Sequence, residues 1–427
     1  MLSLKLLREN PQTVIDRLAL KNFDARELVE SIIAMDDKRR ALQTATEATQ
    51  AELNVTAKQI GLLMQQGKQE EAAVAKLTTT AGKERLKEWD AELQALTQQL
   101  NDSLVLLPNL PSKLVPKGKS AEDNVIVYEG GVIPNFEGTL SRPLPHWELA
   151  AKYNIIDFDL GVKIAGAGFP VYKGKGARLQ RALISYFLDF NTAAGYTEVQ
   201  PPLMVNEASG YSTGQLPDKS GQMYYVDLDR FYLIPTAEVP VTNIFRDVIL
   251  EAGELPVKMT AYTPCFRREA GSYGKDVRGL NRLHQFDKVE IVQVCTPKNS
   301  YKTLNGMVEH VVKLVQSLGL PYRIVCLCGG DLSFTSALTY DFEVYSAAQE
   351  RWLEVSSVSN FESYQSNRLK LRYRDENHKT QLLHTLNGSS LALPRIVAAL
   401  LENNQGESGI TIPQVLRPYT GFDRIDG

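Results

Sequence analysis

The feature that most restricts how this chain can fold is residues 24–104, a run without proline and with few glycines. Its composition is dominated by Ala, Gln, Glu, Lys and Leu, which are strong helix formers. Such a run is far longer than an ordinary helix of about 12 residues. The sequence therefore predicts very long helices here rather than a compact bundle.

Both halves of this run have a heptad pattern. In the first half, the positions reached from Leu28 by alternating steps of four and three residues form a seam that is partly apolar and partly polar. They are Ile32, Met35, Arg39, Leu42, Thr46, Thr49, Leu53, Thr56, Ile60 and Leu63. The second half has a cleaner seam, Leu86, Trp89, Leu93, Leu96 and Leu100. Between them Gly67 can take the left-handed conformation that a tight reversal needs. We expect an antiparallel coiled-coil hairpin over about residues 27–101.

This arm must belong to a larger molecule. A first helix from Glu27 to Gln65 would be on the order of 60 Å long, and two helices are too thin to bury a core of their own. Pro108 and Pro111 end the helical run, and a charged linker, residues 117–123, follows. Beyond it the pattern predicts strands at 232–234, 289–294 and 323–328, and helices at 176–193, 300–318 and 394–403.

Composition excludes several classes of protein. The net charge of −3 argues against a basic nucleic-acid coat protein, and no apolar stretch approaches the 18 or so residues of a membrane span. Four cysteines are too few for a disulfide framework and favour a reducing cytoplasm. Cys326 and Cys328 could be zinc ligands, but alternation along a buried strand explains them better.

The most informative segment for chemistry joins Phe-Arg-Arg-Glu at 266–269, through a Gly-rich charged stretch, to residues 282–290. Two strands linked by a polar loop can present Arg267, Glu269 and Phe286 to one ligand. Arginine offers a planar fork for a phosphate or carboxylate, and the ring offers a stacking face. Taken alone, a surface hairpin with weak ion pairs explains the segment better.

Three further segments are each ambiguous. On a strand at 352–360, Glu354 and Ser356 would share one face, and Val355 and Ser357 the other. Such oxygens suit Mg²⁺, although a polar edge strand explains the segment better when it is taken alone. Residues 384–395 form a polar loop before a helix whose first turn holds Arg395, which could meet a polyphosphate, although an ordinary helix start explains this segment better when it is taken alone. Residues 195–203 alone suggest only a helix cap, a strand and a proline stop.

Taken in order, these segments resemble the three signature motifs of class II aminoacyl-tRNA synthetases, and in detail they are similar to the seryl-tRNA synthetase family. The carrying residues are LIPTAEVPVTN around 236–238, FRRE at 266–269, GLNRLHQFDKVE at 279–290, EVSSVSN from 354 and HTLNGS from 384. The helical arm matches the family's tRNA-binding hallmark, so the likeness covers the whole chain.

The resemblance implies an α+β fold: an N-terminal antiparallel coiled-coil hairpin and a class II catalytic domain with an antiparallel sheet flanked by helices. It implies a tRNA-binding domain at 1–110, a linker and entry segment at 111–165 and the catalytic domain at 166–427. The implied function is a serine–tRNA ligase. It would activate L-serine with ATP and Mg²⁺ to seryl-adenylate and transfer it to the 3′ end of tRNA(Ser), with tRNA(Sec) as a further candidate.

The resemblance also implies a cytoplasmic homodimer with no membrane or DNA partner. Two alternatives stay open. A non-catalytic, synthetase-like tRNA-binding protein should have lost Arg267, Glu269 or Arg395, and all are present. A paralogue that aminoacylates a carrier protein should lack the long arm.

Site residues follow from the resemblance position by position. The expected catalytic arginines are Arg267, at the α-phosphate, and Arg395, at the γ-phosphate. The expected serine-binding set is Thr236, Ala237, Glu238, Arg267, Glu290, Asn387 and Ser389. The expected ATP-binding set is Arg267, Arg268, Glu269, Phe286, Glu354, Val355, Ser356, Ser357 and Arg395. Glu354 and Ser357 would hold the metal, and Pro202 would lie at the dimer interface. Ser390 and Pro394 stand where the family often has glycine.

Overall fold

The computed structural model describes residues 1–138, 140–218, 220–269 and 278–426. It has two compact units, Met1–Ala19 with Phe23–Pro108, and Leu20–Asn22 with Asn109–Gly427. Each is described by itself.

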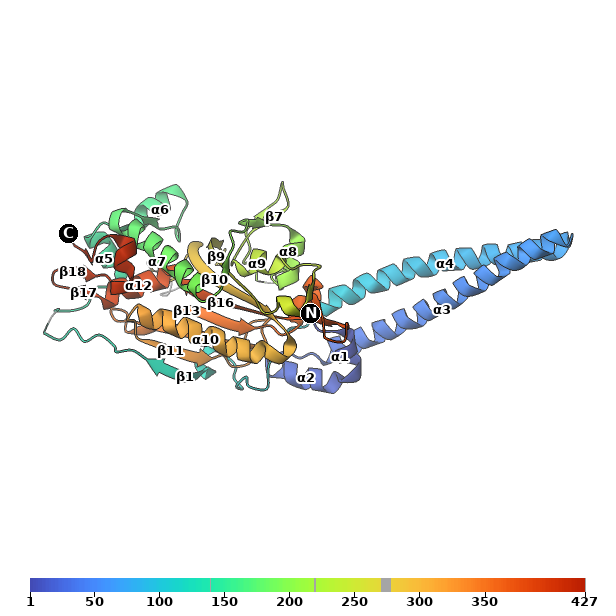
Figure 1. The fold of residues 1–427 in the computed structure, drawn as a ribbon, viewed down its shortest axis with the longest axis horizontal. Helices are drawn as coiled ribbons and strands as arrows, with labels where there is room; N and C mark the ends of the chain where they lie inside the picture. The colour runs from blue at the N-terminus through green and yellow to red at the C-terminus, as the bar shows by residue number, and fades with distance from the viewer. Residues whose placement is uncertain (139, 219, 270–277, 427) are drawn as a thin grey trace. The chain divides into compact units, whose positions relative to one another are not determined.

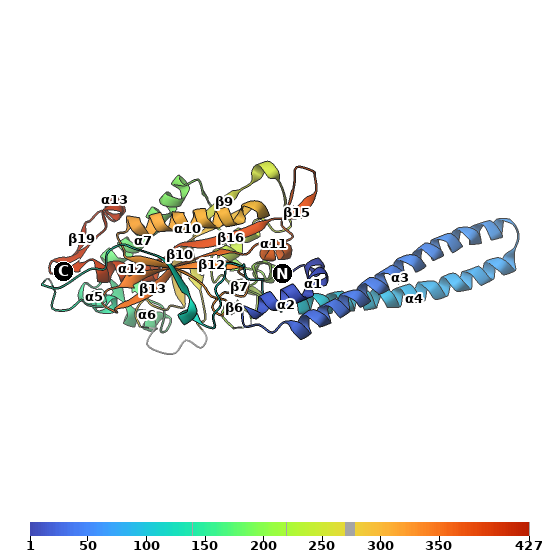
Figure 2. The ribbon, with the colours of Figure 1, turned by 90° about the horizontal axis from the view of Figure 1, so that it is seen from below.

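The first unit contains the expected helical hairpin. Helices α3 (Arg26–Gln65) and α4 (Gln69–Leu104) run antiparallel around Gly67, which has a φ of 74° (Figures 1 and 2). Every residue of both heptad seams is buried or half-buried, which confirms the pattern. A Cβ at Gly82 would lie 2.7 Å from Leu53 Cδ2, so the helices approach closely there.

The base of the hairpin explains why the first seam is polar at Arg39. Helices α1 (Leu4–Glu9) and α2 (Pro11–Ala19) pack against α3 around fully buried Leu7, Leu18 and Ile32. Asp36 is also fully buried, and its carboxylate accepts hydrogen bonds from Arg8 Nη1 at 3.0 Å and Arg39 Nη2 at 2.8 Å. Arg39 is therefore held by a buried charge that needs a partner.

The second unit is built on an eight-stranded sheet with the order β1-β11-β12-β13-β16-β10-β9-β4. Neighbouring strands are antiparallel except β4 and β9. The strands are β1 (Val125–Gly130), β11 (Tyr322–Cys326), β12 (Leu338–Ser346), β13 (Arg351–Asn360), β16 (His384–Ala392), β10 (Gln285–Cys295), β9 (Val257–Phe266) and β4 (Thr197–Glu198).

Three helices cover one face of this sheet and enclose the core. They are α7 (Gly174–Ala193), α10 (Ser300–Ser317) and α12 (Leu393–Asn403), close to the ranges expected from the sequence (Figure 2). Their apolar side chains, among them Phe187, Val311 and Leu400, pack with Ile291 and Phe342 of the sheet. The α+β fold class is thus confirmed.

Shorter elements complete the unit. Its remaining helices are α5 (His146–Lys152), α6 (Phe158–Ile164), α8 (Glu207–Thr213), α9 (Glu238–Asn243), α11 (Tyr364–Leu369) and α13 (Arg417–Thr420). The remaining strands are β2 (Ile156–Asp157), β3 (Val171–Tyr172), β5 (Met204–Val205), β6 (Tyr225–Val226), β7 (Phe231–Leu233), β8 (Ile249–Glu251), β14 (Arg372–Arg374), β15 (Thr380–Leu382), β17 (Gln405–Gly406), β18 (Gly409–Thr411) and β19 (Arg424–Ile425). Within the described ranges, no helix has the length and apolar character needed to cross a membrane.

One expectation about the sheet is wrong. Glu354 pairs with Glu343, and Ser356 pairs with the adjacent Phe342, so Val355 is an extra residue in a β-bulge. The bulge shifts the alternation of β13 by one residue. Ser356 therefore lies on the core face with Phe342, and Glu354 shares the opposite face with Ser357 rather than with Ser356.

Candidate active site

The sheet face opposite the three long helices gathers polar side chains from several strands. Directly paired residues of antiparallel strands point to the same face. Glu290 pairs with Ser389, and the next pair on that face places Asn387 beside Val292. Phe286 lies four residues before Glu290 on β10 and shares this face.

At the centre of this face is a buried cluster of three polar side chains. Thr236 Oγ1 donates to Glu290 Oε2 at 3.1 Å and accepts from Lys288 Nζ at 2.8 Å, and Lys288 also forms an ion pair with Glu290. Burial raises the pKa of the Glu290 carboxyl, while the Lys288 ammonium opposes that shift. The cluster can recognise a small ligand with both donor and acceptor groups.

A second carboxylate borders the cluster. Glu238 opens α9, its side chain is buried, and its Oε1 accepts from Gln365 Nε2 at 2.6 Å. Burial raises the pKa of Glu238 to about 7, although the hydrogen bond from Gln365 lowers it. Gln365 is held in turn by Thr385 Oγ1 at 2.7 Å. This carboxyl can change its charge near neutral pH.

Lys288 and Gln365 were absent from the residues expected at the site. Strand alternation could have found Lys288, because it lies two residues before Glu290 on the same strand. Nothing local marks Gln365, which reaches the site from α11 through the tertiary fold. In contrast, Ala237 was expected there, yet it is fully buried in an apolar cluster with Val292 and can offer only its backbone to a ligand.

The segment that carries Arg267 lies next to this cluster. Arg267 Nε donates to the carbonyl of Pro235, adjacent to Thr236, at 3.3 Å. Its guanidinium carbon lies 5.1 Å from the centre of the Phe286 ring. His284 holds the backbone of Arg267: its ring Nδ1 lies 3.0 Å from the Arg267 carbonyl oxygen, and its own carbonyl accepts from the Arg267 amide at 2.9 Å, which fits a supporting role.

Glu269 and Arg268 lie at the end of the described part of this segment. Glu269 has a left-handed φ of 49°, and its Oε2 accepts from Arg282 Nη1 at 2.8 Å. The Arg268 amide donates to the Gln222 oxygen at 2.8 Å. The Gly-rich stretch that follows, residues 270–277, lies outside the described residues.

Arg395 is fixed at the start of α12. Its Nη1 donates to the Glu354 carbonyl at 2.7 Å and its Nε to the Asn281 carbonyl at 3.1 Å. The Glu354 carboxylate lies 3.8 Å from Nη1. Pro394 occupies the first turn of α12, where the missing amide proton costs nothing. The buried Ser390 hydroxyl donates to Asn191 Oδ1 at 2.8 Å. The structure therefore accommodates both departures from glycine.

Oxygen ligands gather on the bulged part of β13. The bulge brings Glu354 and Ser357 to one face, and Asp341 pairs with Ser357 there. Burial and the nearby Glu354 charge raise the pKa of Asp341 well above its usual range. Its Oδ1 is buried and has no hydrogen-bond partner in the described part of the chain. Among the described residues, no cluster of three or more His, Cys, Asp and Glu side chains has metal-binding geometry.

Three other expected residues lie apart from this face. Val355 is buried in the core, and Ser356 Oγ donates to the Ser389 carbonyl at 2.6 Å, so neither side chain points toward a nucleotide. Pro202 lies after β4 and is exposed beside Leu203 and Met204, which are 36% and 51% exposed.

An antiparallel sheet with one arginine at its β9–β10 hairpin and another in the first turn of α12, the helix after β16, defines a class II aminoacyl-tRNA synthetase core. The model "tRNA synthetase class II core domain (G, H, P, S and T)" matches residues 224–404, and "Seryl-tRNA synthetase N-terminal domain" matches residues 1–111.

Full-length relatives narrow the class to one family. Proteins named serine–tRNA ligase from Salinibacter ruber and Akkermansia muciniphila are 50% and 45% identical, over all of this chain and 99% of theirs. The crystal structure of seryl-tRNA synthetase from Pyrococcus horikoshii complexed with ATP is 32% identical, with a TM-score of 0.93 over 100% of this chain and 99% of that one. The chain belongs to the seryl-tRNA synthetase family, which confirms the family inferred from the motifs.

Proposed function

We propose that this protein is a serine–tRNA ligase that forms seryl-adenylate from L-serine and ATP and transfers the seryl group to tRNA(Ser). The observation that carries the proposal is the buried Thr236–Lys288–Glu290 cluster directly beside Arg267. That arrangement would offer polar groups to a small polar amino acid next to a cation for the reacting phosphate.

The serine pocket would work by pairing every polar group of the ligand. Glu290, with Thr236 and Ser389 beside it, would receive the serine hydroxyl, and Glu238 would bind the ammonium group. Alanine and glycine would leave buried polar groups unpaired, which can cost a factor of about 10⁴–10⁵. Threonine keeps the hydroxyl, so its exclusion would depend on the space available for the extra methyl group.

The nucleotide would bind along the arginines. Arg267 would meet the α-phosphate and Arg395 the γ-phosphate, with adenine stacked on Phe286 and its amino group at Glu269. Because Arg267 now lies over the Phe286 ring, we expect it to turn toward the phosphate when adenine binds. Attack of the serine carboxylate on the α-phosphate brings two anions together, so positive charge and positioning matter more than a general base.

The residues on β12 and β13 fit the Mg²⁺ that this chemistry would use. Glu354, Ser357 and the Oδ1 of Asp341, which has no hydrogen-bond partner among the described residues, offer hard oxygen ligands, which Mg²⁺ prefers together with water and phosphate. When bound, Mg²⁺ would neutralise charge on the departing diphosphate. Glu354 would also hold Arg395 through its carbonyl, so the same residue would orient both positive charges.

The arm would bind tRNA. Arg40, Lys83, Arg85 and Lys87 are exposed on α3 and α4 and could meet phosphates, whereas Arg39 is engaged by Asp36. In this proposal residues 1–110 form the tRNA-binding domain, 111–165 the linker and 166–427 the catalytic domain. tRNA(Sec) remains a candidate second substrate.

We further propose a cytoplasmic homodimer. The exposed apolar residues next to Pro202, Leu203 and Met204, support an interface at that position. The edge strand β1 adds Val125, Ile126 and Val127, which are about half-exposed. Sedimentation at micromolar concentration tests the oligomeric state.

The deciding experiment is ATP–diphosphate exchange with purified protein, followed by charging of tRNA(Ser). We expect exchange that depends on serine and is at least 100-fold weaker with alanine or glycine. A non-catalytic tRNA-binding protein would show tRNA binding with no exchange for any amino acid. That result would refute the proposal.

A further inference from the structure

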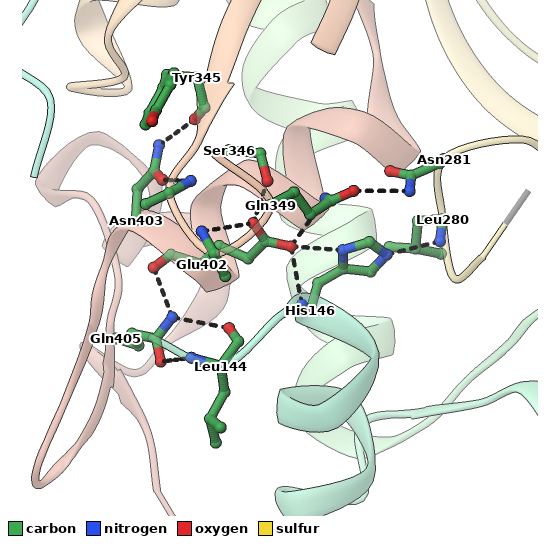
Figure 3. A network of polar contacts seen from close by, with 12 residues as sticks. Leu144, His146, Leu280, Asn281, Tyr345, Ser346, Gln349, Glu402, Asn403 and Gln405 are labelled. Atoms are coloured by element: carbon green, nitrogen blue, oxygen red, sulfur yellow. Dashed lines mark hydrogen bonds and ion pairs between the residues drawn. The ribbon is translucent and has the colours of Figure 1, made fainter. Parts of the chain in front are cut away.

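A buried histidine–glutamate pair links three separate segments of the second unit. His146 begins α5, Glu402 lies near the end of α12, and both side chains are fully buried. His146 Nδ1 lies 2.7 Å from Glu402 Oε1 (Figure 3). Neither residue was predicted from the sequence to have a role.

The other hydrogen bonds fix the protonation of the pair. The Leu280 amide donates to His146 Nε2 at 2.8 Å, so Nε2 is an acceptor and the proton is on Nδ1. Glu402 is then the acceptor for Nδ1, and it also accepts from the His146 amide at 2.9 Å and from Ser346. Burial raises the pKa of the Glu402 carboxyl, but the hydrogen bonds from His146 and Ser346 lower it more, so the pKa lies below its ordinary value. His146 therefore donates to Glu402 through Nδ1 and accepts from Leu280 through Nε2.

The pair continues to the nucleotide side of the fold. Gln349 Nε2 donates to Glu402 Oε1 at 3.1 Å, and Asn281 Nδ2 donates to Gln349 Oε1 at 2.9 Å. The Asn281 carbonyl accepts from Arg395 Nε at 3.1 Å. Because Arg395 and Glu402 belong to the same helix, these bonds form a closed ring that ties both ends of α12 to Leu280 and Asn281. Figure 3 shows the part of the ring that joins His146, Glu402, Gln349 and Asn281.

Steric contact strengthens this link. Gly279 precedes Leu280 with a left-handed φ of 68°, and a Cβ there would lie 2.2 Å from His146 Nε2. The imidazole thus packs directly against the backbone at the point where the chain turns toward β10. A side chain at position 279 would therefore collide with the ring.

We propose that His146 is a positioning residue for the nucleotide site: it holds the backbone of Leu280 and Asn281, and thereby sets the direction of the Arg395 guanidinium. The inference rests on the proposed function, in which Arg395 binds the γ-phosphate. Displacing a phosphate-binding cation by about 1 Å can cost on the order of 100-fold in rate. The effect should concern ATP and leave serine alone, because the Thr236–Lys288–Glu290 cluster is bonded internally, and within the described residues no hydrogen bond or ion pair joins it to a member of this ring.

Two substitutions of His146 separate positioning from stability. In His146→Asn, the amide reaches the place of Nδ1 and can still donate to Glu402, but it cannot reach Leu280. In His146→Gln, the amide oxygen reaches the place of Nε2 and can accept from Leu280. We expect His146→Asn to lower kcat/KM for ATP at least tenfold in serine-dependent exchange, with the KM for serine changed less than twofold. His146→Gln should restore kcat/KM for ATP to within threefold of the unmodified protein.

Controls make the outcome decisive. His384→Ala removes another histidine contact in the same unit, from Nδ1 to Ser300 Oγ at 2.9 Å, and should lower Tm without a selective change for ATP. Gln349→Ala breaks the ring at a half-buried side chain and should also lower kcat/KM for ATP selectively, which decides the matter if His146→Asn does not fold. Equal losses for ATP and serine, or no loss in a folded variant, would overturn the inference. Absence of exchange in the unmodified protein would instead refute the proposed function.

Discussion

Thr236 and Glu290 are 54 residues apart in the chain and are joined by a buried hydrogen bond of 3.1 Å between Thr236 Oγ1 and Glu290 Oε2. The bond connects the segment entering α9 to the middle of β10. Lys288 completes the arrangement by contacting both partners. Glu290 is therefore held in one position before any ligand arrives. The proposed recognition of the serine hydroxyl would benefit from this preorganisation.

The first prediction concerns Glu290→Ala. We expect the KM for serine in ATP–diphosphate exchange to rise at least 100-fold and the KM for ATP to stay within threefold, because the variant leaves Lys288 and the ligand hydroxyl without their acceptor. Glu309→Ala, at an exposed position of α10, is the control and should change neither. An unchanged KM for serine would show that Glu290 does not bind the serine side chain.

The second prediction uses the raised pKa of Glu238. Burial moves it from 4.5 to about 7, so below pH 4.5 the carboxyl is protonated in both the folded and the unfolded chain. As pH rises from 4.5 to 7 only the unfolded chain loses this proton, and the folded state loses stability by roughly 3 kcal/mol in total. Above pH 7 the loss is complete.

Glu238→Gln cannot lose a proton and should escape this loss. Glu198→Gln, at an exposed position, is the control. In urea titrations it should change the free energy of unfolding by nearly the same amount at pH 4.5 and at pH 8. From pH 4.5 to pH 8, Glu238→Gln should become more stable relative to the unmodified protein, with its free energy of unfolding rising by about 3 kcal/mol in that comparison. A difference independent of pH would mean that Glu238 titrates normally.

Local patterns predicted the hairpin well. The heptad positions around Leu53 and Leu86 specify which side of each helix is buried, and Gly67 marks the reversal, so neighbouring residues contain all the information. The same holds for α7, α10 and α12, whose apolar periodicity is strong. Arg39 is the exception to the apolar pattern of the first seam. A polar residue stands there because it pairs with the buried Asp36, and that burial depends on the packing of α1 against α3.

The site was predictable as residue types but not as geometry. One motif contains both Glu354 and Ser357, yet strand alternation placed them on opposite faces, because a β-bulge depends on the partner strand β12. Gln365 and the His146–Glu402 pair were missed because they contact the site only through tertiary packing. Such contacts leave no periodic signal in one sequence.

The third prediction tests the bulge. Ser357→Ala should raise the Mg²⁺ concentration for half-maximal exchange several-fold, because it removes an oxygen from the face that holds Glu354. Ser356→Ala should leave the Mg²⁺ requirement unchanged, since that hydroxyl bonds the Ser389 carbonyl on the other face, and should cost about 1 kcal/mol in stability. Regular alternation of β13 would give the reverse result. Titrating Mg²⁺ in the exchange assay therefore distinguishes the two arrangements.

The fourth prediction separates the arm from catalysis. Lys38 Nζ lies 2.9 Å from Glu92 Oε1, and Gly82 packs on Leu53, so the two helices have a defined register. Deleting residues 46–88 and joining the helices by a short Gly-containing turn preserves that register at the base. We expect charging of tRNA(Ser) to fall more than 100-fold while exchange stays within twofold.

A charge variant of the full-length arm is the control for the deletion. It tests through salt dependence whether the arm binds tRNA phosphates. Replacing Lys83, Arg85 and Lys87 by Ala keeps the hairpin, because all three are exposed. If they neutralise phosphates, the slope of log affinity against log salt should decrease by about 0.7–0.9 for each phosphate that is no longer neutralised. Filter binding of tRNA between 50 and 200 mM KCl measures the slope. Serine activation should barely respond to salt in either protein, because the charges of the proposed active site are enclosed in the second unit. If the triple substitution left the salt slope of tRNA binding unchanged, the tRNA-binding residues would lie elsewhere on the chain.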